Sequence, residues 1–277
     1  MRTHPLSLAI WIGGKLGRLA YHLPLRERII AVRQVRRFLP GAPADTVHRL
    51  FEHLGRSIVE AALCRHVIRH SSFACEGWEI IKEEHGAGRG IVALTGHLGN
   101  WDLLAGYVGS RGVPLYAIGR EARRRLVQPL LQRLRDASSV MMLWRDGLSG
   151  AREIIRLLEA GNTIAALIDQ DTTVRSEWVP FLGIPAKTPS TFAQFAIRTD
   201  AAIVSAFLVR TAPLSYRVSI RRVEDRSSVR RILEQYHSHL EELLREFPEQ
   251  WVWIHKRWRT PEGAQTMSSA EYLSWLT

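Results

Sequence analysis

Cysteine is scarce in this sequence of 277 residues, with only Cys64 and Cys75. Two cysteines do not build a disulfide framework, so we expect two buried, reduced thiols in a protein that faces the cytosol. The sequence also lacks internal repeats and low-complexity tracts, which excludes a solenoid and long disordered segments. The hydrophobic fraction of 46% is high enough to form a sizeable core.

Acidic residues are in the minority, because 27 Asp and Glu stand against 38 Lys and Arg and give a formal net charge of +11. Such a surface favours anionic partners, namely nucleic acid, lipid headgroups or acidic proteins. Arginine clusters at 120–135 and 219–231 either serve such a partner or form solvated helix faces. The basic residues are dispersed, and no zinc, RNP or recognition-helix signature accompanies them, so we do not expect nucleic-acid binding.

No uninterrupted apolar run is long enough to cross a membrane. The stretch "HPLSLAIWIGGKLGRLAYHLP" (4–24) is apolar only as far as Lys15, short of the roughly 18 to 20 residues that a spanning helix needs. It shows no obvious small-residue cleavage site, so a cleaved signal peptide is not expected. The stretch is either an interfacial helix in the lipid headgroup layer or a helix packed on the protein core.

The pattern of apolar residues changes near residue 85. Residues 1–85 carry helical spacing, as in "ERIIAVRQVRRFL" (27–39), and form a helical N-terminal region. Residues 86–277 alternate short apolar runs with helical patterns, which predicts βαβ units around a mainly parallel sheet flanked by helices. The expected strands are 90–94, 114–119, 139–144, 163–169, 202–209 and an edge strand at 216–223, and the expected helices are about 100–111, 121–135, 147–160, 190–199 and 228–247.

Polar residues follow several of these strands at their carboxyl ends, where ligands bind in open α/β sheets. His97 follows the strand at 90–94, and Arg120 follows the strand at 114–119. Asp169 and Asp171 end the strand at 163–169. These side chains are therefore expected to converge on one edge of the sheet.

The stretch "TGHLGNWDLLAG" (95–106) contains the main candidate for catalysis. Gly96 and Gly99 allow a tight turn, and Asn100 is a good helix cap. Asp102 then falls in the first helical turn, from which it can accept the imidazole N–H of His97 and leave the other nitrogen as a general base. An H-x₄-D pair alone is equally typical of a capping or core pair.

No Ser or Cys occupies a G-x-S-x-G elbow, so such a base would activate a substrate hydroxyl directly. Metal chemistry is not expected. The histidine pairs His66/His70 and His237/His239 lack further ligands, and surface histidines are the expected alternative to a zinc site.

These motifs resemble those of a known family. "HLGNWD" (97–102) is similar to the H-x₄-D/E block of the glycerolipid and lysophospholipid acyltransferases, and above all to "HFGNWE" of the branch that acylates lipid A precursors. The sequence departs from that branch at Asp102, where Glu is usual, and matches it less well over 120–146. Further similar blocks are "LIDQD" (167–171), "VPFLGIPAKTPSTFAQFAIRTDAAIVSAFLVR" (179–210), "PEQWVWIHKRW" (248–258), "VRQVRRFLP" (32–40) and "LGRSIVEAAL" (54–63).

The resemblance implies transfer of a fatty acyl chain from an acyl carrier protein or coenzyme A thioester to a hydroxyl of a lipid acceptor, without a cofactor. His97 and Asp102 would be catalytic. N–H groups of the glycine-rich turn, or a nearby arginine, would stabilise the oxyanion. The resemblance also implies that the protein acts at the anionic cytoplasmic face of a bacterial inner membrane, to which the chain is bound peripherally or by a weak anchor.

Other residues are candidates for binding the substrate. Arg120 is the tentative basic residue of the region after the second strand, with Arg145 as the other candidate. Asp169 and Gln170 either hold the catalytic loop or cap the strand end. Lys187 and Thr188 precede a helix, where N–H groups and hydroxyls favour a phosphate of the acceptor. Lys256 and Arg257 either bind such a phosphate as well or simply face solvent. Trp251, Trp253 and Trp258 line an acyl pocket, reach the membrane interface or pack in the core.

Three alternatives remain at this point. The chain is an acyltransferase of the same fold with another acceptor, such as a lysophospholipid, an ornithine lipid, a phosphoinositol mannoside or a pigment lipid. The second alternative, which the dispersed basic residues disfavour, is a nucleic-acid-binding protein. Or it is a lipid-binding relative without catalysis, against which the intact pair of His97 and Asp102 argues.

Overall fold

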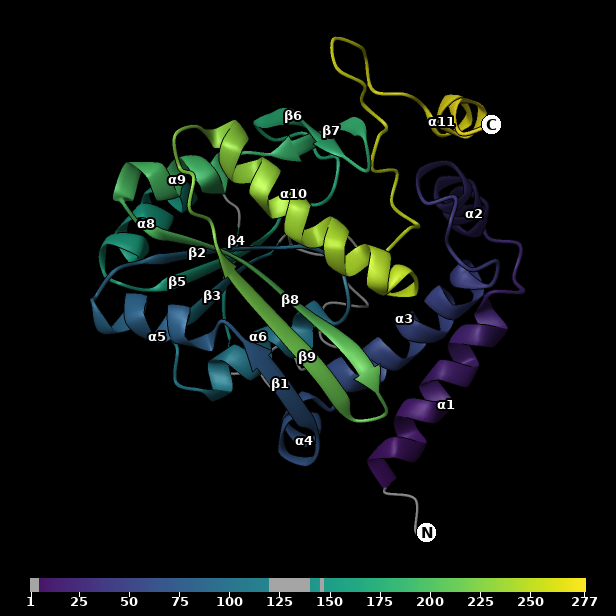
Figure 1. The fold of residues 1–277 in the computed structure, drawn as a ribbon, viewed down its shortest axis with the longest axis horizontal. Coiled ribbons are helices and arrows are strands. Elements are labelled where there is room, and N and C mark those ends of the chain that lie inside the picture. Colours follow the sequence, from purple (N-terminus) through teal and green to yellow (C-terminus); the bar gives the residue numbers. More distant parts are fainter. Residues whose placement is uncertain (1–4, 120–139, 145–146) are drawn as a thin grey trace.

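The computed structural model describes residues 5–119, 140–144 and 147–277, and a seven-stranded sheet lies at its centre (Figure 1). In chain order the strands of this sheet are β1 (Ser72–Glu76), β2 (Ile91–Thr95), β3 (Leu115–Gly119), β4 (Met141–Trp144), β5 (Thr163–Leu167), β8 (Ala202–Ala212) and β9 (Ser215–Arg222). Their spatial order is β1-β9-β8-β2-β5-β3-β4. The neighbours from β8 to β4 run parallel, while β9 is antiparallel to β8. The predicted α/β class with a mainly parallel sheet is confirmed.

Helices surround the sheet. They are α1 (Pro5–Ala20), α2 (Arg26–Phe38), α3 (Thr46–Ala62), α4 (Cys64–His70), α5 (Trp78–Gly86), α6 (Trp101–Ser110), α8 (Gly147–Glu159), α9 (Thr191–Thr199), α10 (Val229–Glu246), a 3₁₀ turn η1 (Pro248–Gln250) and α11 (Ser269–Trp275). The predicted N-terminal helical region is present. The predicted helix at 121–135, Arg120 and Arg145 lie outside the described residues.

Two hydrophobic cores occupy the two faces of the sheet, because successive side chains of a strand point to opposite faces. Val92 and Leu94 of β2 pack with α8, α9 and α10. Ile91 and Ala93 of the same strand pack on the other face with α4, α5 and α6. This alternation assigns each residue near the end of β2 to one face, which matters for the site below.

The structure differs from the expected strands in three places. The predicted edge strand at 216–223 is an inner strand, because β1 pairs with β9 and forms the edge in its place. β1 is short and alternates between exposed and half-buried residues, a weak signal next to the helices that flank it. The strands β6 (Ser176–Phe181) and β7 (Ile184–Pro189) form a hairpin that the sequence did not predict.

α1 lies beside α3 along one side of the molecule (Figure 1). Leu6 and Ile10 of α1 are buried, while several other apolar side chains of this helix are exposed. α1 therefore packs on the core with one face only. Within residues 5–119, 140–144 and 147–277, no helix combines the length and the apolar character that crossing a membrane requires. Both cysteines are free thiols, as predicted, but only Cys64 is buried, and Cys75 is half-buried.

Candidate active site

His97 and Asp169 meet at the carboxyl edge of the sheet. Thr95, the last residue of β2, pairs with Leu167, the last residue of the parallel neighbour β5. The residues two positions further along each chain therefore reach the same level of the sheet edge. His97 Nδ1 is 2.7 Å from Asp169 Oδ1. Because a carboxylate only accepts, Nδ1 carries the proton and Nε2 keeps its lone pair.

The carboxylate of Asp169 is buried and receives three hydrogen bonds. Besides the His97 ring, Oδ2 accepts the His97 backbone N–H at 2.7 Å and the Trp251 indole N–H at 2.9 Å. Burial by itself raises the pKa of Asp169, but the charge of His97 and the hydrogen bonds from His97 and Trp251 outweigh it and hold this pKa well below its ordinary value. An ionised carboxylate therefore stands against the imidazole at neutral pH.

Asp102 was expected to accept the imidazole N–H. The structure shows Nδ1 of His97 bound to Asp169, and the orienting role of Asp102 stays a prediction. Asp102 does lie in the first turn of α6, and Asn100 caps this helix as predicted by accepting the Leu103 backbone N–H. The physical reason for the difference is the strand register, which brings a residue from a distant segment onto the ring. Spacing within one segment contains no information about such a partner.

Gln170 bridges His97 to a second histidine that the sequence analysis did not single out. Its Nε2 is 3.0 Å from His97 Nε2 and 2.7 Å from His255 Nε2. An amide NH₂ has two protons to donate, so it satisfies both ring nitrogens. Burial first, and then the nearby charge of His97, lower the pKa of His255 to about 4, which keeps this ring neutral and accepting at neutral pH. Only its place in the "PEQWVWIHKRW" block pointed to His255.

The loop that carries His97 is held by close backbone contacts. Gly99 has a φ of +66°, and a Cβ there would lie 1.7 Å from the carbonyl oxygen of Leu208. A Cβ at Gly96 would lie 2.9 Å from Asp169 Cγ. The His97 carbonyl accepts the N–H of Val252 at 3.0 Å. Small residues therefore allow the loop to pack tightly between the sheet and the segment after η1.

A buried polar network supports the loop from the side of α3. Glu60 binds the guanidinium of Arg210 through two contacts of 2.7 and 2.5 Å and also accepts from the Asn100 amide at 2.9 Å. Arg210 Nη1 donates to His53 Nδ1 at 2.8 Å. His53 Nε2 then carries the remaining proton and donates to the Gly99 carbonyl at 3.0 Å. An ion pair between α3 and β8 thus fixes both the helix cap and the turn.

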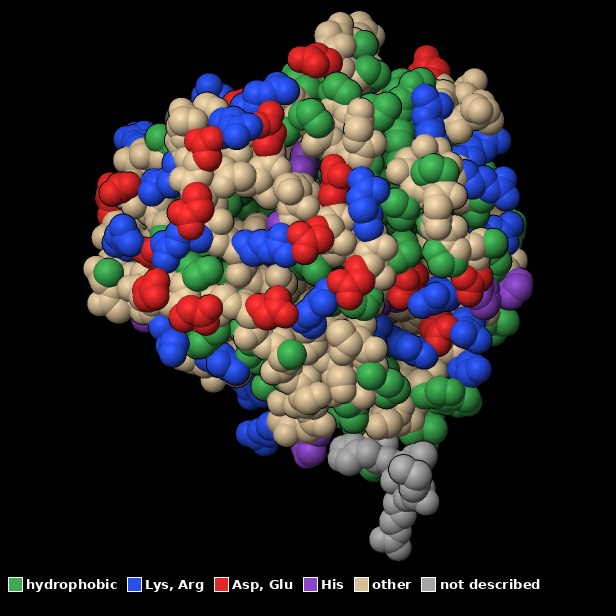
Figure 2. All heavy atoms as spheres, viewed as in Figure 1, with side chains coloured by type: hydrophobic (Ala, Val, Ile, Leu, Met, Phe, Trp, Pro, Cys, Tyr) green, Lys and Arg blue, Asp and Glu red, His purple; other side chains and the backbone are tan. Residues whose placement is uncertain are grey.

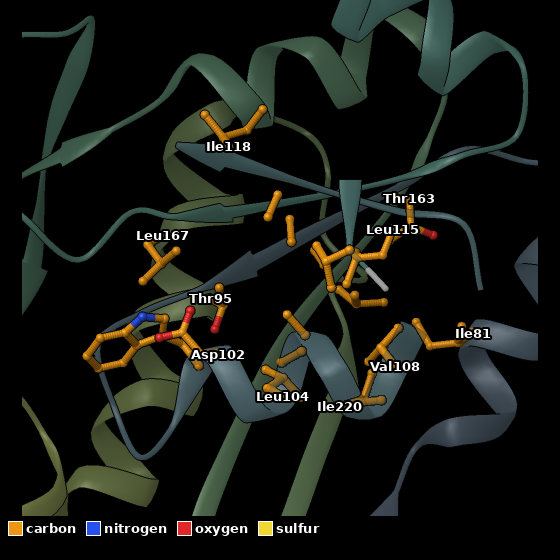
Figure 3. Close-up of a pocket in the computed structure, with 18 of the residues that line it drawn as sticks. Ile81, Thr95, Asp102, Leu104, Val108, Leu115, Ile118, Thr163, Leu167 and Ile220 are labelled. Carbon is orange, nitrogen blue, oxygen red and sulfur yellow. The ribbon is translucent and has the colours of Figure 1, made fainter. Parts of the chain in front are cut away.

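An apolar pocket with a cavity volume of about 160 Å³ extends under α6 from the residues next to His97 (Figure 3). Trp101, whose ring centroid is 4.7 Å from that of His97, lines it. Figure 3 shows Thr95, Asp102 and Leu167 at one end and Thr163 and Leu115 at the other. The pocket therefore runs along the sheet from the polar edge into the core.

Alanines on adjacent strands create the space for this pocket. Ala93 of β2 pairs with Ala165 of β5, which pairs with Ala117 of β3. All three line the pocket, and Val204 and Met142 continue the same row on the outer strands. A row of methyl groups leaves a furrow between the sheet and α6 that larger side chains would fill.

Comparisons with known proteins show the family to which this chain belongs. The family model for bacterial lipid A biosynthesis acyltransferases matches residues 1–260. The chain belongs to this family. It is 25% identical over 278 aligned positions to the lipid A biosynthesis palmitoleoyltransferase of Escherichia coli (strain K12), covering 95% of this chain and 89% of the relative. The lipid A biosynthesis acyltransferase of Shigella flexneri matches with the same identity and coverage.

The other predicted site residues of this acyltransferase lie in or against the β6–β7 hairpin, which packs next to α10. Thr188 is buried and accepts from Arg257 Nη2 at 2.6 Å, so its hydroxyl is engaged inside the protein. Arg257 is buried as well and does not face solvent. Lys187 lies half-buried with its ammonium 5.9 Å from the centroid of the Trp178 ring. Neither residue forms a hydrogen bond or ion pair with His97 among the described residues, and their role in binding the acceptor stays a prediction.

The tryptophans of the final block are part of the core of the acyltransferase. Trp251, Trp253 and Trp258 are all fully buried. Among the alternatives left open by the sequence, core packing is therefore confirmed, and these side chains do not reach a membrane interface. Trp251 has in addition a polar role, since its indole holds Asp169.

The network under the loop generates a stability prediction. We expect Glu60→Gln to lower the free energy of unfolding by about 3 to 5 kcal/mol, because the buried guanidinium of Arg210 loses its counter-charge. Glu242→Gln is the matched control, since its pair with Arg221 is exposed, and should cost less than about 1 kcal/mol. Urea unfolding followed by tryptophan fluorescence measures both. Equal, small losses would show that the network does not hold the loop.

Proposed function

We propose that this family member moves a fatty acyl chain from an acyl thioester to a hydroxyl of a lipid A-like acceptor, with His97 as the general base. The observation that carries this proposal is an imidazole, held by a buried carboxylate, beside the mouth of an enclosed apolar pocket. A base next to a hydrocarbon-lined pocket is the arrangement that acyl transfer to an alcohol requires.

His97 acts through its Nε2 atom. Asp169 accepts the Nδ1 proton, fixes the tautomer and stabilises the imidazolium that forms when Nε2 takes a proton. The His97 side chain is 19% exposed, so an acceptor can reach it. Nε2 now receives an N–H of Gln170, and the acceptor hydroxyl would replace that contact. The spacing of Asp102 predicts the orienting role for that residue, and the experiment on the two carboxylates below separates them.

The pocket would hold part of the acyl chain of the donor. It reaches from the row of Thr95 and Leu167 to the row of Thr163 and Leu115, four residues along β5, which is about 13 Å of strand. A cavity of about 160 Å³ is close in volume to one that takes a single benzene ring, so it would hold only the end of a fatty acyl chain. Each methylene buried there contributes about 0.8 kcal/mol to binding.

The donor would be a fatty acyl thioester of acyl carrier protein or coenzyme A. Both carriers are anionic, and the net charge of +11 would favour encounter with either one. Figure 2 shows basic and acidic side chains interspersed over α10 and β9 on the face in view, where Arg221 pairs with Glu242 and Arg217 with Glu246. That face offers no single basic patch, so the carrier would dock elsewhere.

The acceptor would come from an anionic membrane against which α1 lies. The exposed apolar side chains of α1 are Leu8, Trp11, Ile12, Leu16 and Leu19. Together with the turn after β8, this helix lines an apolar groove that also contains Arg56 and Arg210. The turn lies at the carboxyl edge of the parallel strands, as His97 does. We infer peripheral attachment at the cytoplasmic face of a bacterial inner membrane.

The two carboxylates of the site can be told apart by mutation. His97→Ala should abolish acyl transfer, and Asp169→Asn should lower kcat by about 10² to 10⁴, because the tautomer and the imidazolium lose their support. Asp102→Asn should cost about tenfold or less. Rates are measured with dodecanoyl-acyl carrier protein and a lipid A precursor, with lysophospholipid as the alternative acceptor.

Thermal unfolding of each variant is the control, since Asp169 binds three donors. Full activity of the His97→Ala protein would refute the mechanism. If Asp102→Asn loses as much acyl-transfer activity as His97→Ala, Asp102 rather than Asp169 orients the imidazole.

The alanine row should set the acyl chain length. Ala165→Leu, at the centre of the row, is expected to move the preferred donor to shorter chains, since each excluded methylene costs about fourfold in binding. The measurement is kcat/KM over donors of graded length. Ala264→Leu, in an exposed loop, is the control. An unchanged chain-length profile in Ala165→Leu would place the acyl chain outside this pocket.

Membrane attachment through α1 is tested with vesicles. The wild-type protein should sediment with phosphatidylglycerol vesicles more than with phosphatidylcholine vesicles, and added salt should weaken binding. The double variant Leu16→Glu, Leu19→Glu should lose most of this binding. Ile197→Glu, on the exposed side of α9, is the matched control. Equal binding by both variants would exclude α1 as the contact.

A further inference from the structure

Thr95 carries a buried hydroxyl that the fold does not use. It is the last residue of β2 and is 6% exposed, and within the described part of the chain its Oγ1 has no hydrogen-bond partner. Its carbonyl, by contrast, accepts from the Tyr236 hydroxyl at 2.8 Å and from the Ile168 N–H at 3.0 Å. A buried hydroxyl without a partner is unfavourable for stability, so its position in the protein needs an explanation.

The hydroxyl lies on the face of the sheet that carries the pocket. Ile91 and Ala93 of β2 pack toward α6, and alternation places Thr95, the last residue of this strand, on that same side. Thr95 lines the pocket, and Figure 3 shows it at the same end as Asp102. Trp101, which packs against the His97 ring, lines this end as well. A thioester carbonyl at the pocket mouth would therefore lie between the hydroxyl and the imidazole.

Several other donors near this point are already engaged. The glycine-rich turn was expected to stabilise the oxyanion through its N–H groups. The N–H of His97 binds Asp169, that of Gly99 binds the Gln250 carbonyl, and that of Asn100 binds the Leu208 carbonyl. The amide of Gln170 reaches both His97 and His255. The Thr95 hydroxyl is a donor at this end for which no protein acceptor is provided by the described residues.

We propose that Thr95 is a catalytic residue whose hydroxyl donates a hydrogen bond to the carbonyl oxygen of the acyl thioester. This inference rests on the proposed function. The acceptor oxygen forms a bond to the carbonyl carbon while His97 Nε2 takes its proton, and the π electrons move to the carbonyl oxygen. Thr95 stabilises this oxyanion. The carbonyl then re-forms, the C–S bond breaks, and the thiolate takes the proton from His97.

Thr163 is a matched control for Thr95. It is also a buried threonine whose Oγ1 has no partner within the described residues, and it lines the same pocket at the opposite end (Figure 3). Replacing either threonine by valine removes one unsatisfied hydroxyl and keeps the shape of the side chain. Neither change should reduce stability. The two variants therefore differ in where the hydroxyl is lost along the pocket, and in little else.

The test compares Thr95→Val, Thr95→Ser and Thr163→Val with dodecanoyl-acyl carrier protein and a lipid A precursor. We expect Thr95→Val to lower kcat about 10²-fold with a change in KM below about threefold, since a single oxyanion donor acts in the transition state. Thr95→Ser should retain activity within about tenfold of the wild type. Thr163→Val should keep the wild-type kcat. The melting temperature of Thr95→Val should stay the same or rise.

The outcomes separate the two proposals. A wild-type protein that transfers no acyl group would overturn the proposed function and this inference with it. An active wild type with an unchanged kcat in Thr95→Val would overturn this inference alone. If Thr95→Val and Thr163→Val lose activity equally, or if Thr95→Val loses it together with stability, the hydroxyl has a structural role and the inference is again overturned.

Discussion

The buried carboxylate of Asp169 is the interaction on which the rest of the site depends. It joins three segments that are far apart in the sequence: the end of β5, the loop after β2, and the segment that contains Trp251. A buried charge is tolerated only when it is paired and hydrogen-bonded, and each of these donors meets that need. The same contacts that stabilise the carboxylate hold the His97 ring in one orientation. The same contacts therefore serve both stability and the proposed function.

The carboxyl edge of the sheet is supported on its other side by a second buried charge. Glu60 and Arg210 link α3 to β8, and through Asn100 and His53 they hold the start of α6 and the turn before it. The loop thus lies between two satisfied polar clusters. Preorganised groups need no rearrangement during a reaction, which suits the general-base role proposed for His97. The apolar pocket, by contrast, exists because large side chains are absent, since alanines on three neighbouring strands leave room beneath α6.

Much of the architecture could be predicted from the sequence, because it depends on local signals. Apolar runs that alternate with helical patterns predicted the parallel sheet, and the position of His97 and Asp169 after two such runs placed both at one edge. Asn100 was recognisable as a helix cap because capping depends on the side chain and the next few residues. β1 was missed, since a short strand with exposed alternate residues is specified by its pairing with β9 rather than by its own composition.

By itself the sequence determined the fold class, the family resemblance and the loop with a histidine between glycines. Tertiary structure alone decided which carboxylate binds the ring, that Gln170 joins it to His255, and that the tryptophans of the last block are core residues. The physical reason is register. A parallel sheet aligns residues by how its strands pair, and that pairing is set by the packing of both faces together, which no single segment encodes.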